Sequence, residues 1–93
     1  MIINIEHKNK WNENELITID FRLKQLRFVR EKKDIYSVNL SNDDLEGFIF
    51  LFNHDRNLFF KSVKDELEDF HSFIMDLDIT KMKILNEDLK NER

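Results

Sequence analysis

Residues 16–23 read Leu16-Ile17-Thr18-Ile19-Asp20-Phe21-Arg22-Leu23, and apolar and polar side chains alternate from Ile17 onward. Successive side chains of a β-strand point to opposite faces, so this alternation is typical of a strand that buries one face and exposes the other. The stretch therefore predicts a sheet with a single buried face.

The sequence on either side extends this pattern. Ile3 and Ile5 begin a short strand near the start of the chain. After residue 23 the apolar positions change parity, to Leu26 and Phe28. A change of parity moves side chains to the other face, which predicts a tight turn or a bulge at residues 24–25.

A hairpin follows. If Phe28 lies opposite Tyr36 and Leu26 lies opposite Val38, the loop between the strands needs an odd number of residues. We expect about three residues in this loop, around residues 31–33.

The remainder of the chain changes to a helical period. Ser41 followed by Asp43 and Asp44 predicts a helix cap with acidic residues in the first turn. We prefer a helix over residues 47–52, and the alternative is a strand, because Phe and Ile favour strands and Gly47 is typical of a bulge. The helical interpretation places four apolar residues on one face: Leu45, Phe48, Ile49 and Phe52.

A second, longer helix is predicted from apolar residues spaced three and four apart: Phe60, Val63, Leu67, Phe70, Ile74 and Leu77. The spacing fails at Lys81, so we expect a break within residues 76–80. A last short helix is the simplest interpretation of residues 79–85, and a late strand is the alternative. Residues 86–93 are expected to fray.

These elements predict one α+β domain over residues 1–93. A small antiparallel sheet of three to four strands from residues 1–40 is followed by two or three helices packed on one face. A chain of 93 residues is long enough for one core and too short for two. Nine Phe residues supply apolar area for that core without disulfides.

Composition excludes several kinds of site. The chain has no Cys, which excludes disulfides and thiolate metal sites, and a single Gly, which excludes phosphate-binding loops and the G-x-S-x-G elbow. His7, His54 and His71 lack the spacing that places two imidazoles on one metal, so we expect surface or loop histidines. We therefore predict no enzyme, no cofactor and no metal.

Composition also bears on the setting. The longest apolar run, residues 48–52, is far shorter than the roughly 18 residues of a membrane helix, and no signal peptide is recognisable. We expect a cytoplasmic protein without membrane contact. Abundant Ile, Asn, Lys and Phe, with no Ala or Pro, indicate an AT-rich genome, as in a low-GC bacterium, its phage or another mobile element.

Charge is divided unevenly along the chain. Residues 1–40 carry eight Lys or Arg against six Asp or Glu, whereas residues 41–93 carry seven against thirteen. Arg22, Arg27 and Arg30 suggest a basic strand face that binds nucleic acid. The less specific interpretation, charged strands that resist aggregation, is favoured because the pI is about 5.3.

Acidic residues gather in the second predicted helix. Asp65, Asp69 and Asp76 share one stripe, flanked by Glu66 and Glu68. Such a stripe can dock on a basic groove or imitate a nucleic-acid backbone. An ordinary solvated helix face is the less specific interpretation.

Phe50 and Leu51 form a further candidate surface. On a helix, Phe48 and Phe50 lie about 200° apart and cannot both face one core. Either the segment is buried all round, or Phe50 and Leu51 form an apolar interface for a partner or a second copy.

The leading hypothesis is a non-enzymatic, small acidic module that binds a larger protein through its acidic helix surface. The composition suggests an inhibitor from a phage or mobile element, directed at host defence or nucleic-acid machinery. A homodimer is a further expectation. A nucleic-acid-binding regulator that uses Arg22, Arg27 and Arg30 is the alternative function.

Overall fold

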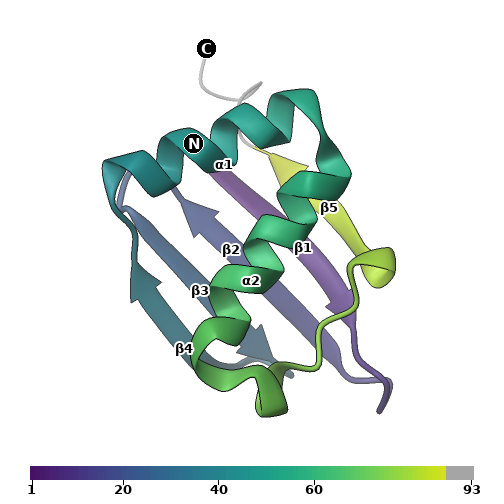
Figure 1. Cartoon of the computed structure of the whole chain (residues 1–93). Helices are drawn as coiled ribbons and strands as arrows, with labels where there is room; N and C mark the ends of the chain where they lie inside the picture. Colours follow the sequence, from purple (N-terminus) through teal and green to yellow (C-terminus); the bar gives the residue numbers. More distant parts are fainter. Residues whose placement is uncertain (88–93) are drawn as a thin grey trace.

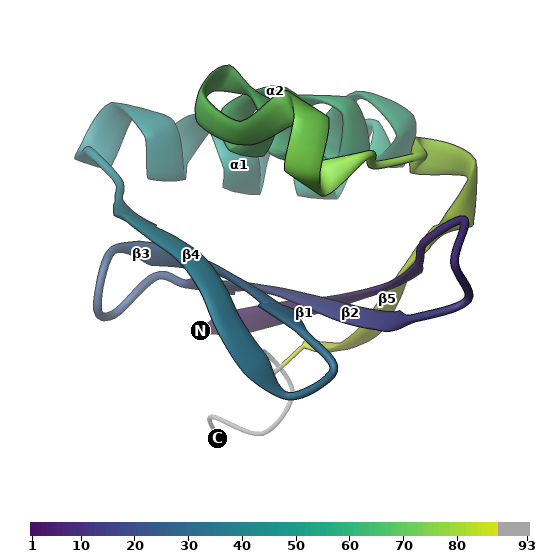
Figure 2. The same cartoon turned by 90° about the horizontal axis from the view of Figure 1, so that it is seen from below.

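The computed structural model describes residues 1–87, without the side chains of residues 70–75, 86 and 87. It shows a five-stranded antiparallel sheet covered on one face by two helices (Figures 1 and 2). The elements follow one another as β1 (Ile2–Lys8), β2 (Asn14–Asp20), β3 (Gln25–Arg30), β4 (Lys33–Asn39), α1 (Asn42–His54), α2 (Arg56–Met75), the single 3₁₀ turn η1 (Ile79–Lys81) and β5 (Met82–Glu87).

The strands lie in the order β4-β3-β2-β1-β5. The first four strands form consecutive hairpins, and the two helices then carry the chain across the sheet so that β5 pairs with β1 at the far edge (Figure 1). The pairing aligns one row of apolar residues across all five strands: Tyr36, Phe28, Ile17, Ile5 and Ile84. This row belongs to the face that the helices cover.

The strand predicted over residues 16–23 is confirmed as β2 for residues 16–20, but its predicted end is wrong, because β2 stops at Asp20 and a turn follows. Beyond it the carboxylate of Asp20 accepts hydrogen bonds from the backbone N–H groups of Arg22 and Leu23, both at 3.0 Å. Lys24 adopts a left-handed conformation with φ 54°. Of the two predicted alternatives, the tight turn is therefore correct, and it begins a few residues before residues 24–25.

The hairpin of β3 and β4 keeps the predicted register, with Phe28 opposite Tyr36. The expected loop of about three residues is wrong. Only Glu31 and Lys32 connect the strands, both with positive φ, as in the two-residue turns that match strand twist. The odd residue lies instead in a bulge of β4 at Ile35, where the register shifts.

Helix α1 begins at a capping box. The Ser41 hydroxyl accepts the N–H of Asp44 at 3.0 Å, and the Asp44 carboxylate accepts the N–H of Ser41 at 3.3 Å. This arrangement satisfies backbone donors that a helix start leaves open. The preference for helix over strand in residues 47–52 is confirmed, because α1 continues to His54.

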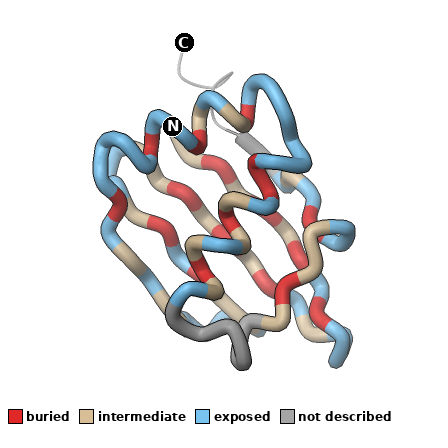
Figure 3. Tube along the Cα trace, viewed as in Figure 1, coloured by how far each residue is buried: buried red, intermediate tan, exposed pale blue. Residues whose placement is uncertain are grey.

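Helix α2 follows α1 after a single residue. Asp55 ends α1 and its carboxylate accepts the N–H of Leu58 at 3.1 Å in the first turn of α2. Phe59 is fully buried at the corner and contacts the rings of Phe48, Phe52 and Phe60, at centroid distances of 5.2 to 6.3 Å. Figure 3 shows the buried positions on the faces where helices and sheet meet.

The last part of the described chain differs from the favoured prediction. The short helix expected in residues 79–85 is wrong, and the late-strand alternative is correct. One 3₁₀ turn leads into β5, and Met82 and Ile84 pair with β1. The strand gives partners to backbone groups that β1 would otherwise expose at an edge. It raises the strand number to five, one more than the predicted maximum.

The prediction that residues 86–93 fray concerns residues on both sides of the end of β5. Residues 86 and 87 complete β5, and the predicted fraying of the remainder falls outside the described residues. Neither helix within residues 1–87 is long and apolar enough to cross a membrane.

Candidate functional site

The five residues of the predicted acidic stripe do not share one surface. Asp65 and Asp69 are exposed on α2, whereas Glu66 and Glu68 are partly buried. Glu68 accepts the backbone N–H of Leu77 at 3.4 Å. The structure therefore places Glu68 beside the segment that leaves the helix.

Asp76 lies outside α2, which ends at Met75. Its backbone is left-handed, with φ 43°, and its carboxylate lies 3.6 Å from the ammonium group of Lys10. The predicted stripe assumed a helix that continues to Leu77. The turn at Asp76 instead directs this carboxylate toward the loop after β1.

A different acidic group does come together on the helical layer. The carboxylates of Asp44, in the first turn of α1, and of Asp69 act electrostatically on Glu66 of α2, and Glu66 and Asp69 act in the same way on Tyr36 of β4. We call Asp44, Glu66 and Asp69 the acidic face. Among the described side chains, no Lys or Arg forms an ion pair with any of the three.

Glu66 holds its charge at an energetic disadvantage. Burial raises the pKa of Glu66, and the carboxylates of Asp44 and Asp69 raise it further. The pKa of Tyr36 is raised by burial and by Glu66 and Asp69. Like charges that lack a neighbouring cation destabilise one another's ionised form. The face is thus a negative surface without an ion-pair partner among the described side chains, in which only Asp44 receives a backbone hydrogen bond, from Ser41.

The three predicted arginines do not form one basic face. Arg22 is exposed in the turn after β2. Arg27 forms an ion pair with Asp34 at 2.7 Å. Arg30 donates to the buried carboxylate of Glu15 at 2.8 Å. Two of the three charges are therefore matched by carboxylates, and the three side chains lie at different places on the sheet.

A buried polar row that the sequence analysis missed crosses one end of the sheet. His7, Glu15 and Arg30 are opposite one another on β1, β2 and β3. The Nδ1 of His7 lies 2.7 Å from Glu15, and Asn9 donates to the same carboxylate at 2.8 Å. His7, Asn9 and Glu15 are each less than 5% exposed. The expectation that all three histidines are surface or loop residues is wrong for His7.

The hydrogen bonds of His7 fix its protonation pattern. Its Nε2 accepts the backbone N–H of Asp78 at 3.1 Å, so Nδ1 carries the proton that is donated to Glu15. Both ring nitrogens are engaged, and the imidazole links the sheet to the segment that follows α2. We therefore assign His7 a structural role.

The pKa of Glu15 results from opposing causes. Burial alone raises the pKa, but hydrogen bonds from His7, Arg30 and Asn9, together with the charge of Arg30, bring it below its ordinary value. Three donors converge on two oxygens, which favours the ionised carboxylate. The row is thus a compensated site, unlike the acidic face.

A signal for this row was present in the sequence. His7 has the parity of Ile3 and Ile5, and Glu15 has the parity of Ile17, so both belong to the apolar side of their strands. A buried charge must be paired or hydrogen-bonded. Glu15 and His7 both occupy strand positions on the same side as the apolar, core-facing residues, and this combination could have predicted a buried pair.

Phe50 and Leu51 separate in the structure. Phe50 is 60% exposed and its ring lies 4.3 Å from that of His54 between centroids. Leu51 is partly buried against the core. The two residues therefore do not form a continuous apolar patch, and an interface through Phe50 would involve His54 as its neighbour. The predicted homodimer stays a prediction.

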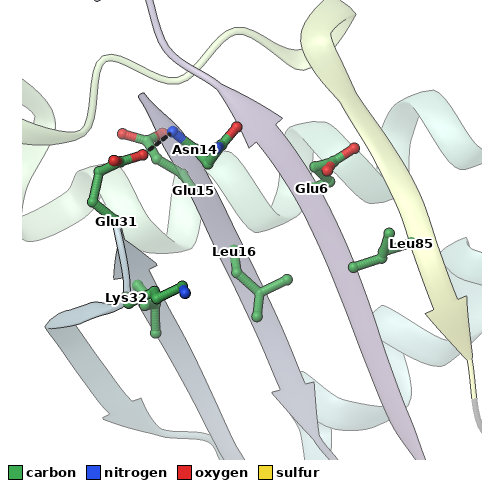
Figure 4. Close-up of a pocket in the computed structure, with 8 residues that line it drawn as sticks. Glu6, Asn14, Glu15, Leu16, Glu31, Lys32 and Leu85 are labelled. Atoms are coloured by element: carbon green, nitrogen blue, oxygen red, sulfur yellow. Dashed lines mark hydrogen bonds between the residues drawn. The ribbon is translucent and has the colours of Figure 1, made fainter. Parts of the chain in front are cut away.

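The sheet face opposite the helices has no covering layer among residues 1–87 (Figure 2). Leu16, Val29 and Leu85 line a hollow of about 290 Å³ there, with Glu6 and Lys32 also in its lining (Figure 4). Leu85 is 55% exposed. This hollow offers apolar contact area bordered by charges of both signs.

Metal binding is not indicated by the described residues, which contain no group of three or more His, Asp or Glu side chains arranged to hold an ion. Neither a protein-family model, nor a curated protein, nor a solved structure matches the chain.

Proposed function

We propose that the chain is a non-enzymatic binding module whose acidic face engages a basic surface of a larger protein. The observation that carries this proposal is the grouping of Asp44, Glu66 and Asp69 from two helices without a described cation among them. A Lys or Arg from a partner would supply the missing counter-charge. Complementary charge of this kind accelerates association and selects the partner.

The energetic state of Glu66 supports the proposal. A group that destabilises the free protein and is relieved on binding is typical of a functional surface. Guanidinium or ammonium groups within about 4 to 6 Å would lower the pKa of a carboxyl. A partner cation would therefore offset the repulsion that Asp44 and Asp69 impose on Glu66.

The composition suggests the setting of this activity. An AT-rich coding bias together with small size and acidity fits an inhibitor made by a phage or mobile element. A basic groove that normally holds nucleic acid is the kind of surface that a set of carboxylates can occupy. We therefore extend the proposal to host defence or nucleic-acid machinery as the partner class.

We expect Glu66→Gln to raise the free energy of unfolding at pH 7, by less than about 1 kcal/mol because the side chain is partly exposed. The native pKa of Glu66 lies above its ordinary value of 4.5, so ionisation weakens the native state, and the amide removes that effect. Below pH 4.5 Glu66 is protonated in both the native and the unfolded state, so the gain in stability of Glu66→Gln should vanish. Urea unfolding at pH 7 and pH 4 checks this; a variant less stable than the wild type at pH 7 contradicts it.

The partner is tested by affinity capture from a low-GC bacterial lysate. We expect the Glu66→Lys/Asp69→Lys variant to capture at least about tenfold less partner than the wild type, because charge reversal at a docking surface causes like-charge repulsion. Glu46→Lys is the matched control, since Glu46 is exposed on α1 and points about 200° away from Asp44 around the helix axis. Quantitative mass spectrometry gives the readout. Equal capture by the reversed and control proteins contradicts the proposal.

A further inference from the structure

A hollow lined by lysines lies at the end of the sheet where β1 stops. Its volume is about 320 Å³, and its lining includes Lys8, Lys10, Lys64 and Lys81. These lysines come from four different segments: β1, the loop after β1, helix α2 and the η1 turn. The fold thus gathers positive charge that is scattered in sequence, in a chain whose formal net charge is −4.

The two aspartates of this hollow are already engaged. Asp78 accepts hydrogen bonds from the backbone N–H and the hydroxyl of Thr80, at 3.0 and 2.6 Å. Asp76 pairs with Lys10 at 3.6 Å. Lys81 acts electrostatically on Asp78, so four lysines of the hollow face two carboxylates, and within the described residues Lys8 and Lys64 form no ion pair. The hollow therefore carries a positive surplus.

The buried polar row gives this hollow a fixed wall. Asn9 is 4% exposed and lines the hollow together with His7. The Asn9 side-chain oxygen accepts the N–H groups of Trp11 and Glu13, at 3.0 and 2.9 Å. These bonds stabilise the turn after β1, in which Lys10 and Trp11 are both exposed.

Trp11 adds an aromatic surface beside the lysines. It is the single tryptophan of the chain and is 57% exposed. The ammonium group of Lys10 lies 4.8 Å from the centre of its ring. An exposed indole next to a phosphate-attracting surface is the arrangement on which unpaired bases stack.

A second hollow continues the positive surface and is lined by residues of β1, β2, η1 and β5. Its volume is about 340 Å³, and it shares Lys8 and Lys81 with the first hollow while adding Lys83. Lys83 pairs with Glu6 at 3.3 Å. The two hollows share Lys8 and Lys81, and together they extend beyond the size of a single phosphate group.

We propose that the two lysine-lined hollows and Trp11 bind single-stranded nucleic acid. Phosphates lie on the ammonium groups, and an unpaired base stacks on the exposed indole. A duplex keeps its bases paired and stacked, so it cannot use Trp11 in this way. This site is distinct from the acidic face and from the arginines considered in the sequence analysis, and it does not depend on the protein-binding proposal.

Trp11 supplies the measurement, because its fluorescence reports on this site alone. We expect an oligothymidylate of about ten nucleotides to quench the emission saturably. Roughly three phosphate contacts predict a slope of about −2 for the logarithm of the association constant against that of the salt concentration. Thymidine monophosphate and a duplex of the same length serve as comparison ligands, and we expect each to bind at least about tenfold more weakly.

Charge reversal locates the site. We expect Lys64→Glu/Lys81→Glu to weaken binding at least about tenfold and to flatten the salt dependence. Lys24→Glu and Arg22→Glu are single-reversal controls in the turn between β2 and β3, at the opposite end of the strands, and should bind like the wild type. If the double reversal does not fold by circular dichroism, Lys64→Gln/Lys81→Gln replaces it. Trp11→Ala, followed by anisotropy of a labelled oligonucleotide, should weaken binding about tenfold.

Four results would overturn the inference. The first is that quenching at low salt is absent or does not saturate, and the second is that the mononucleotide or the duplex binds as tightly as the oligonucleotide. The third is that Arg22→Glu weakens binding as much as the lysine reversals do. The fourth is that Trp11→Ala binds with unchanged affinity.

Discussion

We expect Phe59→Ala to lower the free energy of unfolding by about 3 to 5 kcal/mol. Phe59 is fully buried where α1 meets α2, and three other phenylalanine rings surround it. Truncation removes apolar contact and leaves a cavity that rigid neighbours cannot fill. A loss of this size is a large fraction of the 5 to 15 kcal/mol typical of a small domain.

Urea unfolding followed by circular dichroism measures this loss. Leu58→Ala is the matched control, because Leu58 is the preceding helical residue and is 48% exposed. Its replacement should change stability by less than about 1 kcal/mol. Similar losses for the two variants would show that Phe59 is not the centre of the core.

We expect Glu15→Gln to lower the free energy of unfolding by about 3 kcal/mol. The carboxylate of Glu15 is fully buried and faces donors from His7, Asn9 and Arg30. The amide keeps the shape but replaces one acceptor with a donor, and it removes the nearer of the two carboxylates beside Arg30, so that only Glu13 remains, at 3.9 Å. Removing one member of a buried pair is costly because the other charge stays desolvated. Urea unfolding at pH 7 measures the effect.

The same variant should change the pH dependence of stability. The native pKa of Glu15 lies below its ordinary value of 4.5. Its contribution is therefore fully present above pH 4.5 and is lost as the pH falls through the native pKa. Glu15→Gln should show a flatter decline in acid, whereas Glu46→Gln, on an exposed surface, should follow the wild type. Parallel acid profiles for Glu15→Gln and the wild type would contradict the assignment.

The strands that carry regular alternation were predictable from sequence. Ile17 and Ile19 mark β2 because a sheet with one buried face requires period two, and the pairing of Phe28 with Tyr36 followed from parity. The capping residue Ser41 located the start of α1 for an equally local reason. These features depend on interactions between residues close in sequence.

The fifth strand was harder to predict because its stability comes from a distant partner. Strand β5 has only six residues, and its register with β1 shifts between Asn4 and Ile5. Its apolar residues are therefore spaced in a way that fits a helix and a strand about equally. What decides the conformation is the open edge of β1, about eighty residues earlier in the chain. Local periodicity carries no information about that edge.

The surfaces were predictable only in part. Asp65, Glu66 and Asp69 are on α2 as expected, but the end of the helix at Met75 removes Asp76 from the group. Asp44 acts on Glu66 because the chain turns at Asp55 and α2 comes back across the sheet, which a helical period cannot show. Arg30 turns toward Glu15 because the two are cross-strand partners. Tertiary pairing thus decides which charges are matched and which stay uncompensated.

The division of the surface into an acidic face on the helices and a lysine-lined end of the sheet is tested most directly by amide chemical-shift mapping. A ¹⁵N-labelled protein is titrated with oligothymidylate and, in a second sample, with a lysine-rich peptide. The oligonucleotide should shift the amides of Lys8, Trp11 and Lys81, and the peptide those of Asp44, Glu66 and Asp69. Overlapping sets of shifted amides, or oligonucleotide shifts centred on Arg22 and Arg27, would contradict this division.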